Sequence, residues 1–476
     1  MHARRMRACA PALLLLLPSG LALAASEAAR RPNFLLIVAD DVGTDRIGIY
    51  GEAPGLARTP QVDRLGREGL VFQDVWAMPS CSPTRAALLS GLYPSRTGIG
   101  GAVVPRAPEG RTALGLAETV EILPRALEAA GYSSALLGKW HLGTRAQGLE
   151  HPLRLGFDHH WGSFGNLAAP SGRPTYFSWS KNVDGVQHLH HVYATTDTTD
   201  DAIAMAGKLE EPWLIVVSYN AAHKPRHVPP AHLHSDRGLE KSNRKRPRAF
   251  RAMVEAMDTE IGRLLEHVAP SEPFVFFLGD NGSVQWAYPT SEDHEGRAKG
   301  SLKQGGVRIP FIVSHPSVAA PGRRVKGLAS VTDVFATLVE LAGIDRADAT
   351  LPADSVSLVP QLRSATAPSA RSWVFSESFT PNGPGPYGRS ARAVRDARWK
   401  LIRLANGSAE QFFDLASDPV ERNPLPQRGL EGEAAVAYRR LVKLLEDVPP
   451  LRSPKGTAPT PTTGPSSATL ISPAIE

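Results

Sequence analysis

The sequence predicts an α/β fold: a large mixed, mostly parallel sheet sandwiched by helices, followed by a small C-terminal α+β subdomain. Three observations support this prediction. Apolar runs of strand length alternate with segments of helical period, as in α/β proteins. The runs are apolar throughout, as strands buried on both faces are. From about Trp373 the pattern changes to alternating apolar and polar residues.

The expected strands are five apolar runs, at Phe34–Ala39, Ala135–Leu137, Trp213–Tyr219, Phe274–Leu278 and Pro310–Val313. The expected helices carry apolar residues at helical spacing, at Pro60–Leu70, Pro83–Ser90, Val120–Ala130, Arg248–His267 and Asp333–Ala342. A chain of 476 residues can bury a large core and form more than one unit. We therefore assign residues 31–372 to one large domain.

The C-terminal region has a different character. The stretch "VRDARWKLIRL" alternates like one half-exposed strand, "EQFFDL" is typical of another, and Glu433–Val448 has the pattern of a helix. These elements predict a subdomain over residues 373–450. Residues 451–476 are rich in Pro, Thr, Ser and Gly, which is typical of a disordered tail.

The N-terminus has the pattern of a signal peptide. Arg4, Arg5 and Arg7 precede a short apolar stretch, and Ala22-Leu23-Ala24 is a small-x-small cleavage site, so we expect residues 1–24 to be removed. The apolar stretch is too short to span a bilayer. We expect an exported protein, periplasmic or secreted, without a membrane anchor. Loss of three arginines and no acids lowers the net charge from +6 to about +3, which gives no argument for a nucleic-acid partner.

Polar side chains follow four of the expected strands: Asp40 and Asp41, Lys139 and His141, His223, and Asp280 and Asn281. In open α/β sheets ligands bind at the carboxyl ends of the strands, so these ends together predict an active site. Carboxylate and amide oxygens are hard donors that suit Ca²⁺ or Mg²⁺ better than zinc or copper.

Cys81 is one of two cysteines, and the other, Cys9, lies in the predicted signal peptide. A lone cysteine in an exported protein can be a buried small hydrophobe, a thiol nucleophile or a residue that is chemically converted. Ser82 is a suitable N-cap and Gly91 a suitable helix stop, which places Cys81 at a helix N-terminus. That position, with Arg85 one turn later, is expected to lower the pKa of the thiol.

The segment Cys81-Ser82-Pro83-Thr84-Arg85, followed by "LLSGLYPSRTG", resembles the sulfatase signature C-x-P-S/T-R. Further motifs in the family's order are "DDVGTDRIGIYG", "GKWHLG", "NAAHKP", "GDNG" and "KGSLKQGGVRIP", and "EQFFDLASDPVERNPL" is also typical of the family. The resemblance runs from about Asn33 to about Pro424. It implies an alkaline phosphatase-like fold and a catalytic domain over residues 31–372. It also implies that a dedicated formylglycine-generating enzyme oxidises Cys81 to formylglycine during export.

The resemblance assigns roles to individual residues. The metal ligands would be Asp40, Asp41, Asp280, Asn281 and the converted Cys81, around Ca²⁺, with Mg²⁺ as the alternative. Arg85 would steady the formylglycine, and Lys139 and His141 would flank the nucleophile and the sulfate. His223 and Lys299 would contact the sulfate and the leaving-group oxygen, with His227 the second choice for the role of His223. Gln304 stands where the family usually has Glu, and we interpret that position as support for Lys299.

The chemistry implied is hydrolysis of a sulfate ester. A hydrated aldehyde offers two hydroxyls, of which one attacks sulfur and the other later expels sulfate by re-forming the carbonyl. A phosphonate monoester or phosphodiester hydrolase on the same fold is the first alternative, and a non-catalytic protein that binds sulfated glycans is the second. The sequence does not indicate an oligomeric state.

The segment Phe157–Tyr193 is rich in aromatic residues and histidines. Such residues suit a sugar ring, and they suit a lid or satellite core equally well. Together with the predicted export, the segment favours a sulfated carbohydrate as substrate, with a simple aryl sulfate as the alternative.

Overall fold

The computed structural model describes residues 31–52, 56–105, 114–169, 175–240, 246–290, 294, 296–345, 351–404 and 410–448. The predicted signal peptide and the predicted C-terminal tail lie outside these residues. No helix in the described part of the chain combines the length and the apolar character needed to cross a membrane.

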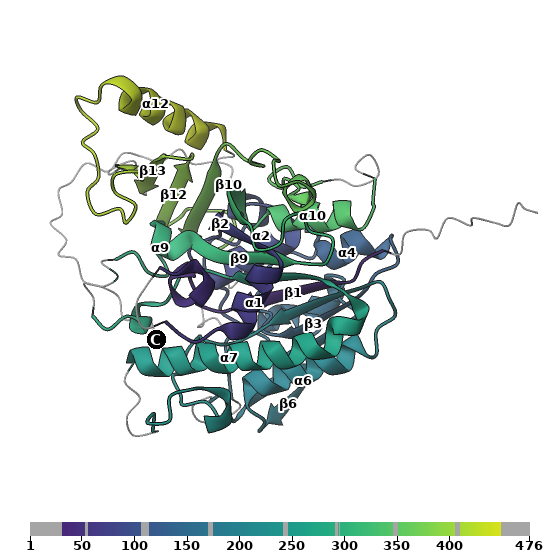
Figure 1. Cartoon of the computed structure of the whole chain (residues 1–476). Coiled ribbons are helices and arrows are strands. Elements are labelled where there is room, and N and C mark those ends of the chain that lie inside the picture. Colours follow the sequence, from purple (N-terminus) through teal and green to yellow (C-terminus); the bar gives the residue numbers. More distant parts are fainter. Residues whose placement is uncertain are drawn as a thin grey trace, which may run out of the picture.

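A ten-stranded sheet forms the centre of the molecule (Figure 1). Five of its neighbouring strand pairs are parallel, and the others are antiparallel. The predicted large mixed sheet is thereby confirmed. From one edge to the other the strands are β10 (Arg324–Ser330), β2 (Leu70–Trp76), β9 (Arg308–Ser314), β8 (Phe274–Gly279), β1 (Phe34–Ala39), β7 (Trp213–Ser218), β3 (Ser133–Gly138), β4 (His159–Gly162), β5 (Trp179–Val183) and β6 (Val186–His190).

Helices cover both faces of this sheet, because the central strand β1 is apolar on both. Phe34, Leu36 and Val38 belong to one buried cluster, and Leu35 and Ile37 belong to a second cluster on the opposite face. The first cluster includes α2 (Cys81–Ser90), α4 (Leu123–Glu128) and α10 (Asp333–Leu341). The second includes α1 (Pro60–Glu68), α6 (Ala194–Ala206) and α7 (Arg246–Val268). Burial of these apolar side chains, at roughly 25 cal/mol per Å², is the main force that holds the layers together.

Shorter helices connect these elements. They are α3 (Pro94–Thr97), α5 (His151–Arg154), α9 (Gln304–Val307) and α11 (Val359–Arg363), with 3₁₀ turns at Thr44–Arg46, Gly48–Tyr50, Arg145–Gln147, Ala231–Leu233, Ala269–Ser271 and Gln285–Ala287.

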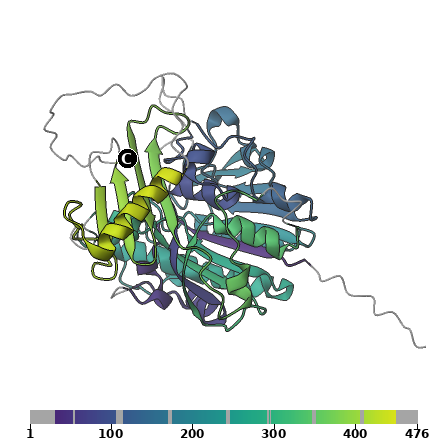
Figure 2. The same ribbon diagram turned by 90° about the horizontal axis from the view of Figure 1, so that it is seen from above.

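A small antiparallel sheet and one helix make up the C-terminal part, as predicted. The sheet has the order β11 (Val374–Thr380), β12 (Arg389–Arg395), β13 (Trp399–Leu404) and β14 (Glu410–Asp414), and α12 (Gly432–Asp447) lies across it (Figure 2). Leu401 belongs to the same buried cluster as Leu441 of α12, whereas its neighbour Ile402 belongs to the cluster that contains Trp76 of the large sheet. Successive side chains of β13 point to opposite faces of the small sheet, so one face belongs to the core shared with α12 and the other to the core shared with the large sheet.

Several local expectations were wrong. The stretch "VRDARWKLIRL" is not one strand: it contains the end of β12, a turn at residues 396–398 and then β13. In that turn the Asp396 carboxylate accepts the N–H groups of Arg398 and Trp399, at 2.8 and 2.7 Å. The helix expected from Pro83 begins at Cys81, and Ser82 is not its cap. The Ser82 hydroxyl donates to the carbonyl of His141 at 2.8 Å and accepts the N–H of Val103 at 2.9 Å.

Candidate active site

Parallel strands bring the predicted site residues to one edge of the sheet. β1 lies between β7 and β8, and Ala39 pairs with Gly279, so Asp40 and Asp280 follow adjacent strand ends. Lys139 follows β3, and its N–H donates to the carbonyl of Ser218, the last residue of β7, at 2.7 Å. The loop after β7 carries His223.

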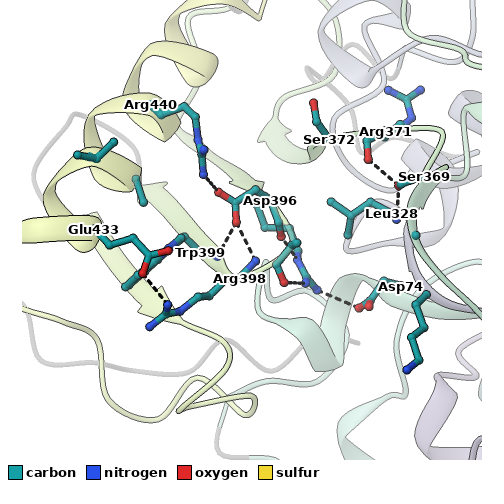
Figure 3. A pocket seen from close by; sticks show the side chains of 16 residues that line it. Asp74, Leu328, Ser369, Arg371, Ser372, Asp396, Arg398, Trp399, Glu433 and Arg440 are labelled. Carbon is teal, nitrogen blue, oxygen red and sulfur yellow. Dashed lines mark hydrogen bonds and ion pairs between the residues drawn. The ribbon is translucent and has the colours of Figure 1, made fainter.

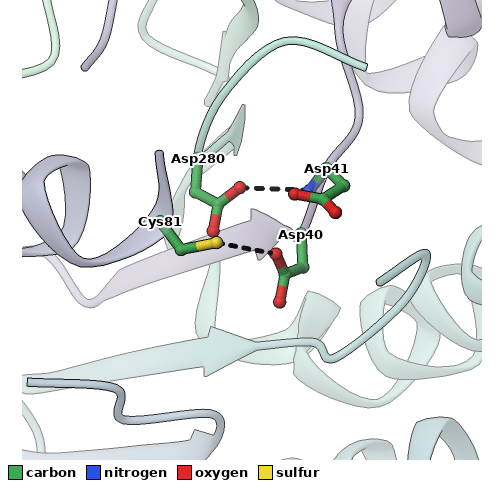
Figure 4. Close-up of side chains that lie close together, drawn as sticks. All are labelled: Asp40, Asp41, Cys81 and Asp280. Carbon is green, nitrogen blue, oxygen red and sulfur yellow. Dashed lines mark hydrogen bonds between the residues drawn. The ribbon is translucent and has the colours of Figure 1, made fainter. Parts of the chain in front are cut away.

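A buried cluster forms at this edge from Asp40, Asp41, Cys81 and Asp280 (Figure 4). One ligand atom from each of the four residues lies within 4.8 Å of the others. The Asp41 N–H donates to Asp280 Oδ1 at 3.1 Å, and Cys81 Sγ lies 3.4 Å from Asp40 Oδ1. Asp41 has a φ of +66°, a left-handed conformation that aspartate adopts more readily than most residues. The sequence could not show that the segments carrying Asp41, Cys81 and Asp280 approach one another so closely.

Asn281 completes a donor set that suits a hard divalent cation. Its Nδ2 donates to Asp41 Oδ1 at 2.9 Å. Its Oδ1 is buried and has no hydrogen-bond partner among the described residues. A buried polar atom without a partner is costly, and a cation beside it removes that cost. The residues present therefore fit Ca²⁺ or Mg²⁺, for which carboxylate and amide oxygens are the preferred ligands.

Three cationic side chains surround the three carboxylates of this cluster. Arg85 forms an ion pair with Asp280 at 2.8 Å, and Lys139 Nζ lies 2.5 Å from Asp40 Oδ2. Lys299 Nζ contacts Asp41 and lies 3.0 Å from Cys81 Sγ. The cluster is therefore balanced in charge by the protein alone. A bound divalent cation would give it a net positive charge, which favours an anionic substrate.

Burial and oppositely charged neighbours shift the pKa values of Asp40, Asp41 and Lys299 in opposite directions. Burial is the largest single influence on Asp40 and would raise its pKa, but the surrounding positive charges, of which Lys139 contributes most, together outweigh burial and hold that pKa below its ordinary value. At Asp41, too, burial is the largest influence, and Lys299 together with His223 and the Asn281 hydrogen bond lowers the pKa below its ordinary value. Burial is the largest single influence on Lys299 and would lower its pKa, but the neighbouring acidic groups, of which Asp41 contributes most, together raise that pKa well above its ordinary value. Both carboxylates are therefore ionised, and Lys299 is charged, at neutral pH.

Cys81 does not have the low thiol pKa that its helix position suggested. Burial, followed by the carboxylates of Asp280 and Asp40, raises its pKa to about 12. The sequence indicated the helix N-terminus and Arg85, but it could not show that strand ends distant in sequence surround the sulfur. An unmodified Cys81 is therefore a neutral thiol and a poor nucleophile at neutral pH.

The three candidate histidines differ in position. His223 Nδ1 lies 2.8 Å from the carbonyl of Lys224, which leaves Nε2 as the nitrogen nearer the cluster, 3.9 Å from Asp41 Oδ2. Burial, with Lys139 next in importance, lowers the pKa of His223. Burial also lowers the pKa of His141 strongly, and its Nδ1 has no hydrogen-bond partner among the described residues. His227 stacks on Tyr176, with ring centroids 3.9 Å apart, so the geometry favours His223 over His227.

Two supporting residues were missed at the sequence level. The Ser218 hydroxyl contacts Arg85 and donates to the carbonyl of Lys139 at 2.6 Å, so it links the Arg85 guanidinium to the backbone that carries Lys139. The buried Tyr176 hydroxyl lies 2.5 Å from the carbonyl of Asn220 and 2.8 Å from that of His223. It therefore braces the loop that carries His223. The only sequence signal for Ser218 was its place at a strand end.

Gln304 does not support Lys299 as we had interpreted it. Its Oε1 accepts the indole N–H of Trp76 at 2.8 Å, and its own N–H donates to Glu421 in the C-terminal part. Lys299 instead donates its backbone N–H to the carbonyl of Ser283 at 2.9 Å. The change from Glu to Gln therefore concerns the contact between the two units and not the position of Lys299.

Replacing Gln304 with leucine is expected to lower the free energy of unfolding by about 1–3 kcal/mol and to leave kcat unchanged. The buried Trp76 N–H would lose its acceptor, and that is the usual cost of an unsatisfied buried donor. Chemical denaturation and steady-state kinetics check the two expectations, with Gln187→Leu on the exposed strand β6 as the control. A large fall in kcat without a fall in stability would restore the original interpretation.

The carboxylates of the cluster can hold a cation, and the three basic side chains can bind an anionic group beside Cys81, which is the chemistry that hydrolysis of an anionic ester requires. Comparison with known proteins is more specific. Residues 32–344 match the sulfatase family, and residues 297–445 match the family described as N-sulphoglucosamine sulphohydrolase, C-terminal. The chain therefore belongs to the sulfatase family, whose members are sulfuric ester hydrolases of the alkaline phosphatase superfamily.

Curated relatives include the human N-acetylgalactosamine-6-sulfatase, 33% identical over 377 residues that cover 71% of this chain and 67% of that protein. The pig protein of the same name is 32% identical, and the match covers 66% of it, so the chain spans about two thirds of these relatives. Human arylsulfatase A is 30% identical over 86% of this chain and 80% of its own length.

Solved structures share the fold. Ps i-CgsB in complex with k-i-k-neocarrahexaose has a TM-score of 0.72 and 23% identity, over 87% of this chain and 93% of that chain. A protein in complex with its substrate D-glucosamine-2-N,6-O-disulfate has a TM-score of 0.68 and 20% identity, over 88% and 97% of the two chains.

Proposed function

We propose that this chain is an exported sulfatase that hydrolyses the sulfate ester of a sulfated carbohydrate. The nucleophile would be a formylglycine derived from Cys81, and the cation Ca²⁺, with Mg²⁺ as the alternative. The observation that carries the proposal is the buried cluster of Asp40, Asp41, Cys81 and Asp280 with its three cationic neighbours. The family to which the chain belongs implies both the formylglycine and a divalent metal.

The metal would be held by Asp40, Asp41, Asp280 and Asn281 together with residue 81, and when bound it would supply positive charge beside the sulfuryl oxygens. Lys139 pairs with Asp40 and Lys299 pairs with Asp41, so both side chains lie at the cluster, where they can stabilise charge that develops on those oxygens. Arg85 is held by Asp280 and Ser218 and keeps its guanidinium beside residue 81. His223 presents Nε2 toward the cluster, where it can exchange a proton with the leaving oxygen.

Conversion of Cys81 is supported by the surroundings of its sulfur. A thiol with a pKa of about 12 is neutral and weakly nucleophilic, and no second cysteine lies in the described part of the chain. The hydrate of a formylglycine supplies two hydroxyl groups at this position, one to attack sulfur and one to release sulfate. Lys299 Nζ, 3.0 Å from Cys81 Sγ, is close enough to donate a hydrogen bond to the oxygen of such a hydroxyl.

A carbohydrate substrate is favoured by the relatives and by one part of the aromatic segment. N-acetylgalactosamine-6-sulfatases are among the relatives, although a steryl-sulfatase is also 30% identical. Most aromatic residues of Phe157–Tyr193 are buried, Tyr176 and Trp179 completely, and serve as core. Phe177 is different because 39% of it is exposed. It stacks on Tyr193, with ring centroids 5.1 Å apart, beside the tyrosine that braces His223. We infer that Phe177 offers its ring to a sugar.

Phe177→Ala is expected to raise KM for a sulfated monosaccharide about 3-fold to 10-fold, the equivalent of one aromatic contact. Inhibition by inorganic sulfate should be unchanged, because the sulfate would bind at the charged cluster. Trp161→Ala is the matched control: Trp161, in β4, is a partly buried ring of the same segment that packs with His159 and lies near the Lys208 ammonium. Equal effects of the two substitutions would contradict a role for Phe177.

A panel of sulfated mono- and oligosaccharides, assayed beside a nitrophenyl sulfate and matched phosphate esters, tests the proposed function. We expect the highest kcat/KM on a sulfated sugar and much lower rates on the phosphate esters. Turnover of the aryl sulfate with none on any sugar would defeat the carbohydrate proposal alone. Faster turnover of the phosphate esters would favour the phosphonate or phosphodiester alternative, which the relatives named above do not support.

A further inference from the structure

The side chain of Ser283 joins the two loops that supply the oxygen ligands proposed above. These are the β1 loop, residues 40–46, and the β8 loop, residues 280–283. Ser283 is completely buried at the end of the β8 loop. Its hydroxyl accepts the N–H of Gly43 at 3.0 Å and donates to Asp45 Oδ1 at 2.7 Å. One side chain of the β8 loop therefore makes two hydrogen bonds to the β1 loop.

The two loops are in close contact at this point. A Cβ added at Gly43 would lie 2.8 Å from Asp45 Oδ1, 3.0 Å from the Ser283 nitrogen and 3.1 Å from its hydroxyl oxygen. The φ of Gly43 is −85°, which other residues also adopt, so the lack of space and not the conformation requires glycine here. The backbone of the β1 loop thus lies directly against Ser283, and the distance between the loops depends on the hydroxyl that fills the gap.

The acceptor of the Ser283 hydroxyl is itself held in position. Asp45 pairs with Arg46 at 3.1 Å, and the Arg46 guanidinium lies over the Tyr288 ring, 4.3 Å from its centroid. Tyr288 belongs to the segment that continues from the β8 loop. The Asp45 carboxylate therefore has support from both segments and offers the hydroxyl a fixed partner.

The backbone of Ser283 makes a separate bond to the segment that carries Lys299. The Ser283 carbonyl accepts the N–H of Lys299 at 2.9 Å, and the N–H of Gly282 donates to the carbonyl of Gly306 at 2.9 Å. Neither bond uses the Ser283 hydroxyl. Removal of the hydroxyl would therefore loosen the β1 loop against the β8 loop and leave the backbone position of Lys299 unchanged.

The Ser283 hydroxyl joins the loops without using a candidate ligand atom. Other hydrogen bonds between the loops do use one: the Asp41 N–H donates to Asp280 Oδ1 at 3.1 Å (Figure 4), and Asn281 Nδ2 donates to Asp41 Oδ1 at 2.9 Å. Each of these bonds ends on a carboxylate oxygen that a cation would also attract. The bonds of the Ser283 hydroxyl do not compete with a cation for those oxygens.

We propose that Ser283 is a positioning residue: it sets the spacing of the β1 and β8 loops so that their oxygens are in place when a divalent cation binds. The inference rests on the proposed function, of which the cation is a part. A spacing that is fixed beforehand lowers the cost of ordering the ligands on binding. Residues that orient metal ligands typically change metal affinity about 10-fold to 100-fold when they are replaced.

Calcium binding by the Ser283→Ala protein tests this role. We expect calorimetry on metal-free protein to show a rise of about 10-fold in the Kd for Ca²⁺. At saturating Ca²⁺ the kcat for nitrophenyl sulfate should match that of the wild type, because the ligands and Lys299 are intact. Ser134→Ala is the matched control. Ser134 is buried near the start of β3, and its hydroxyl also donates to a carboxylate, that of Asp158 at 3.0 Å, and accepts a backbone N–H at 3.3 Å.

Asp45→Ala breaks the same link from its partly exposed side, so the test does not depend on the folding of the Ser283→Ala protein alone. We expect a rise of about 3-fold in the Kd for Ca²⁺, whereas Asp45→Asn, whose amide oxygen can still accept the hydroxyl, should bind like the wild type. The double variant Asp45→Ala and Ser283→Ala should show a rise of about 10-fold, and not the product of about 30-fold that independent residues give.

Ser369→Ala separates the proposed role from a general loosening of the protein. The Ser369 hydroxyl also joins two segments, since it accepts the N–H of Leu328 at 3.0 Å and donates to the carbonyl of Arg371 at 2.7 Å, beside a cavity at the C-terminal part (Figure 3). An unchanged Kd in the Ser283→Ala protein, or an equal rise in either control, would overturn the role of Ser283 alone. A wild-type protein that binds neither Ca²⁺ nor Mg²⁺ would refute the proposed cation and this role with it.

Discussion

Cys81→Ser is expected to lower the steady-state rate by a factor on the order of 10³ or more, as loss of a nucleophile commonly does. Serine keeps an oxygen near the metal ligands, but it has only one hydroxyl. It could accept a sulfuryl group once and could not release it by re-forming a carbonyl. Steady-state kinetics with a nitrophenyl sulfate measure the loss, and mass spectrometry of the intact protein detects a retained sulfate.

The control for this substitution lies in the same helix. Ser90, at the other end of α2, is buried and donates to the carbonyl of Ala86 at 2.6 Å, far from any carboxylate of the cluster. Ser90→Ala should therefore keep its rate per folded molecule. A Cys81→Ser protein with a tenth or more of the wild-type turnover would refute the proposed role of residue 81.

Asp280→Ala is expected to abolish turnover and to remove most of the bound cation. Asp280 is a proposed metal ligand, it accepts the Asp41 N–H at 3.1 Å, and it pairs with Arg85 at 2.8 Å. Its loss leaves Arg85 as a buried cation without its main partner, which should also lower the free energy of unfolding by about 3–5 kcal/mol. Elemental analysis after dialysis, activity and chemical denaturation measure the three effects.

Asp333→Ala separates loss of metal from loss of stability. Asp333 is equally buried and pairs with Arg371, so its removal also leaves a buried arginine without its carboxylate. It should destabilise the protein without a change in metal content. Full metal content in the Asp280→Ala protein, or stoichiometric zinc in the wild type, would contradict the proposed site.

Much of the fold could be predicted because the central strands are unambiguous. Phe34–Ala39 is apolar at every position and buried on both faces, so its predicted bounds agree with the structure. Strand β2 was not predicted, because Gln73 and Asp74 interrupt its apolar pattern at a register shift. Strands β5 and β6 were not predicted either, since "WSKNV" and "VQHLH" have no apolar face.

The positions of the predicted site residues at strand ends indicated that they would lie close together, but the sequence could not indicate how their charges shift one another's pKa values. The expected pKa of Cys81 was wrong because helix position and Arg85 are local features, whereas burial of the sulfur, and the Asp280 and Asp40 carboxylates beside it, result from the folding of distant segments. Ser82 failed as a cap because distant backbone groups, those of His141 and Val103, use its hydroxyl. Gln304 was misinterpreted for a similar reason, since its partner Glu421 comes from the C-terminal part.

Mass spectrometry of the peptide that contains Cys81 tests the central claim most directly. The protein would be produced with and without a co-expressed formylglycine-generating enzyme, and the converted fraction of residue 81 compared with the specific activity of each preparation. We predict formylglycine at residue 81 in active protein, with specific activity proportional to the converted fraction. Fully active protein in which Cys81 is entirely thiol would contradict the account.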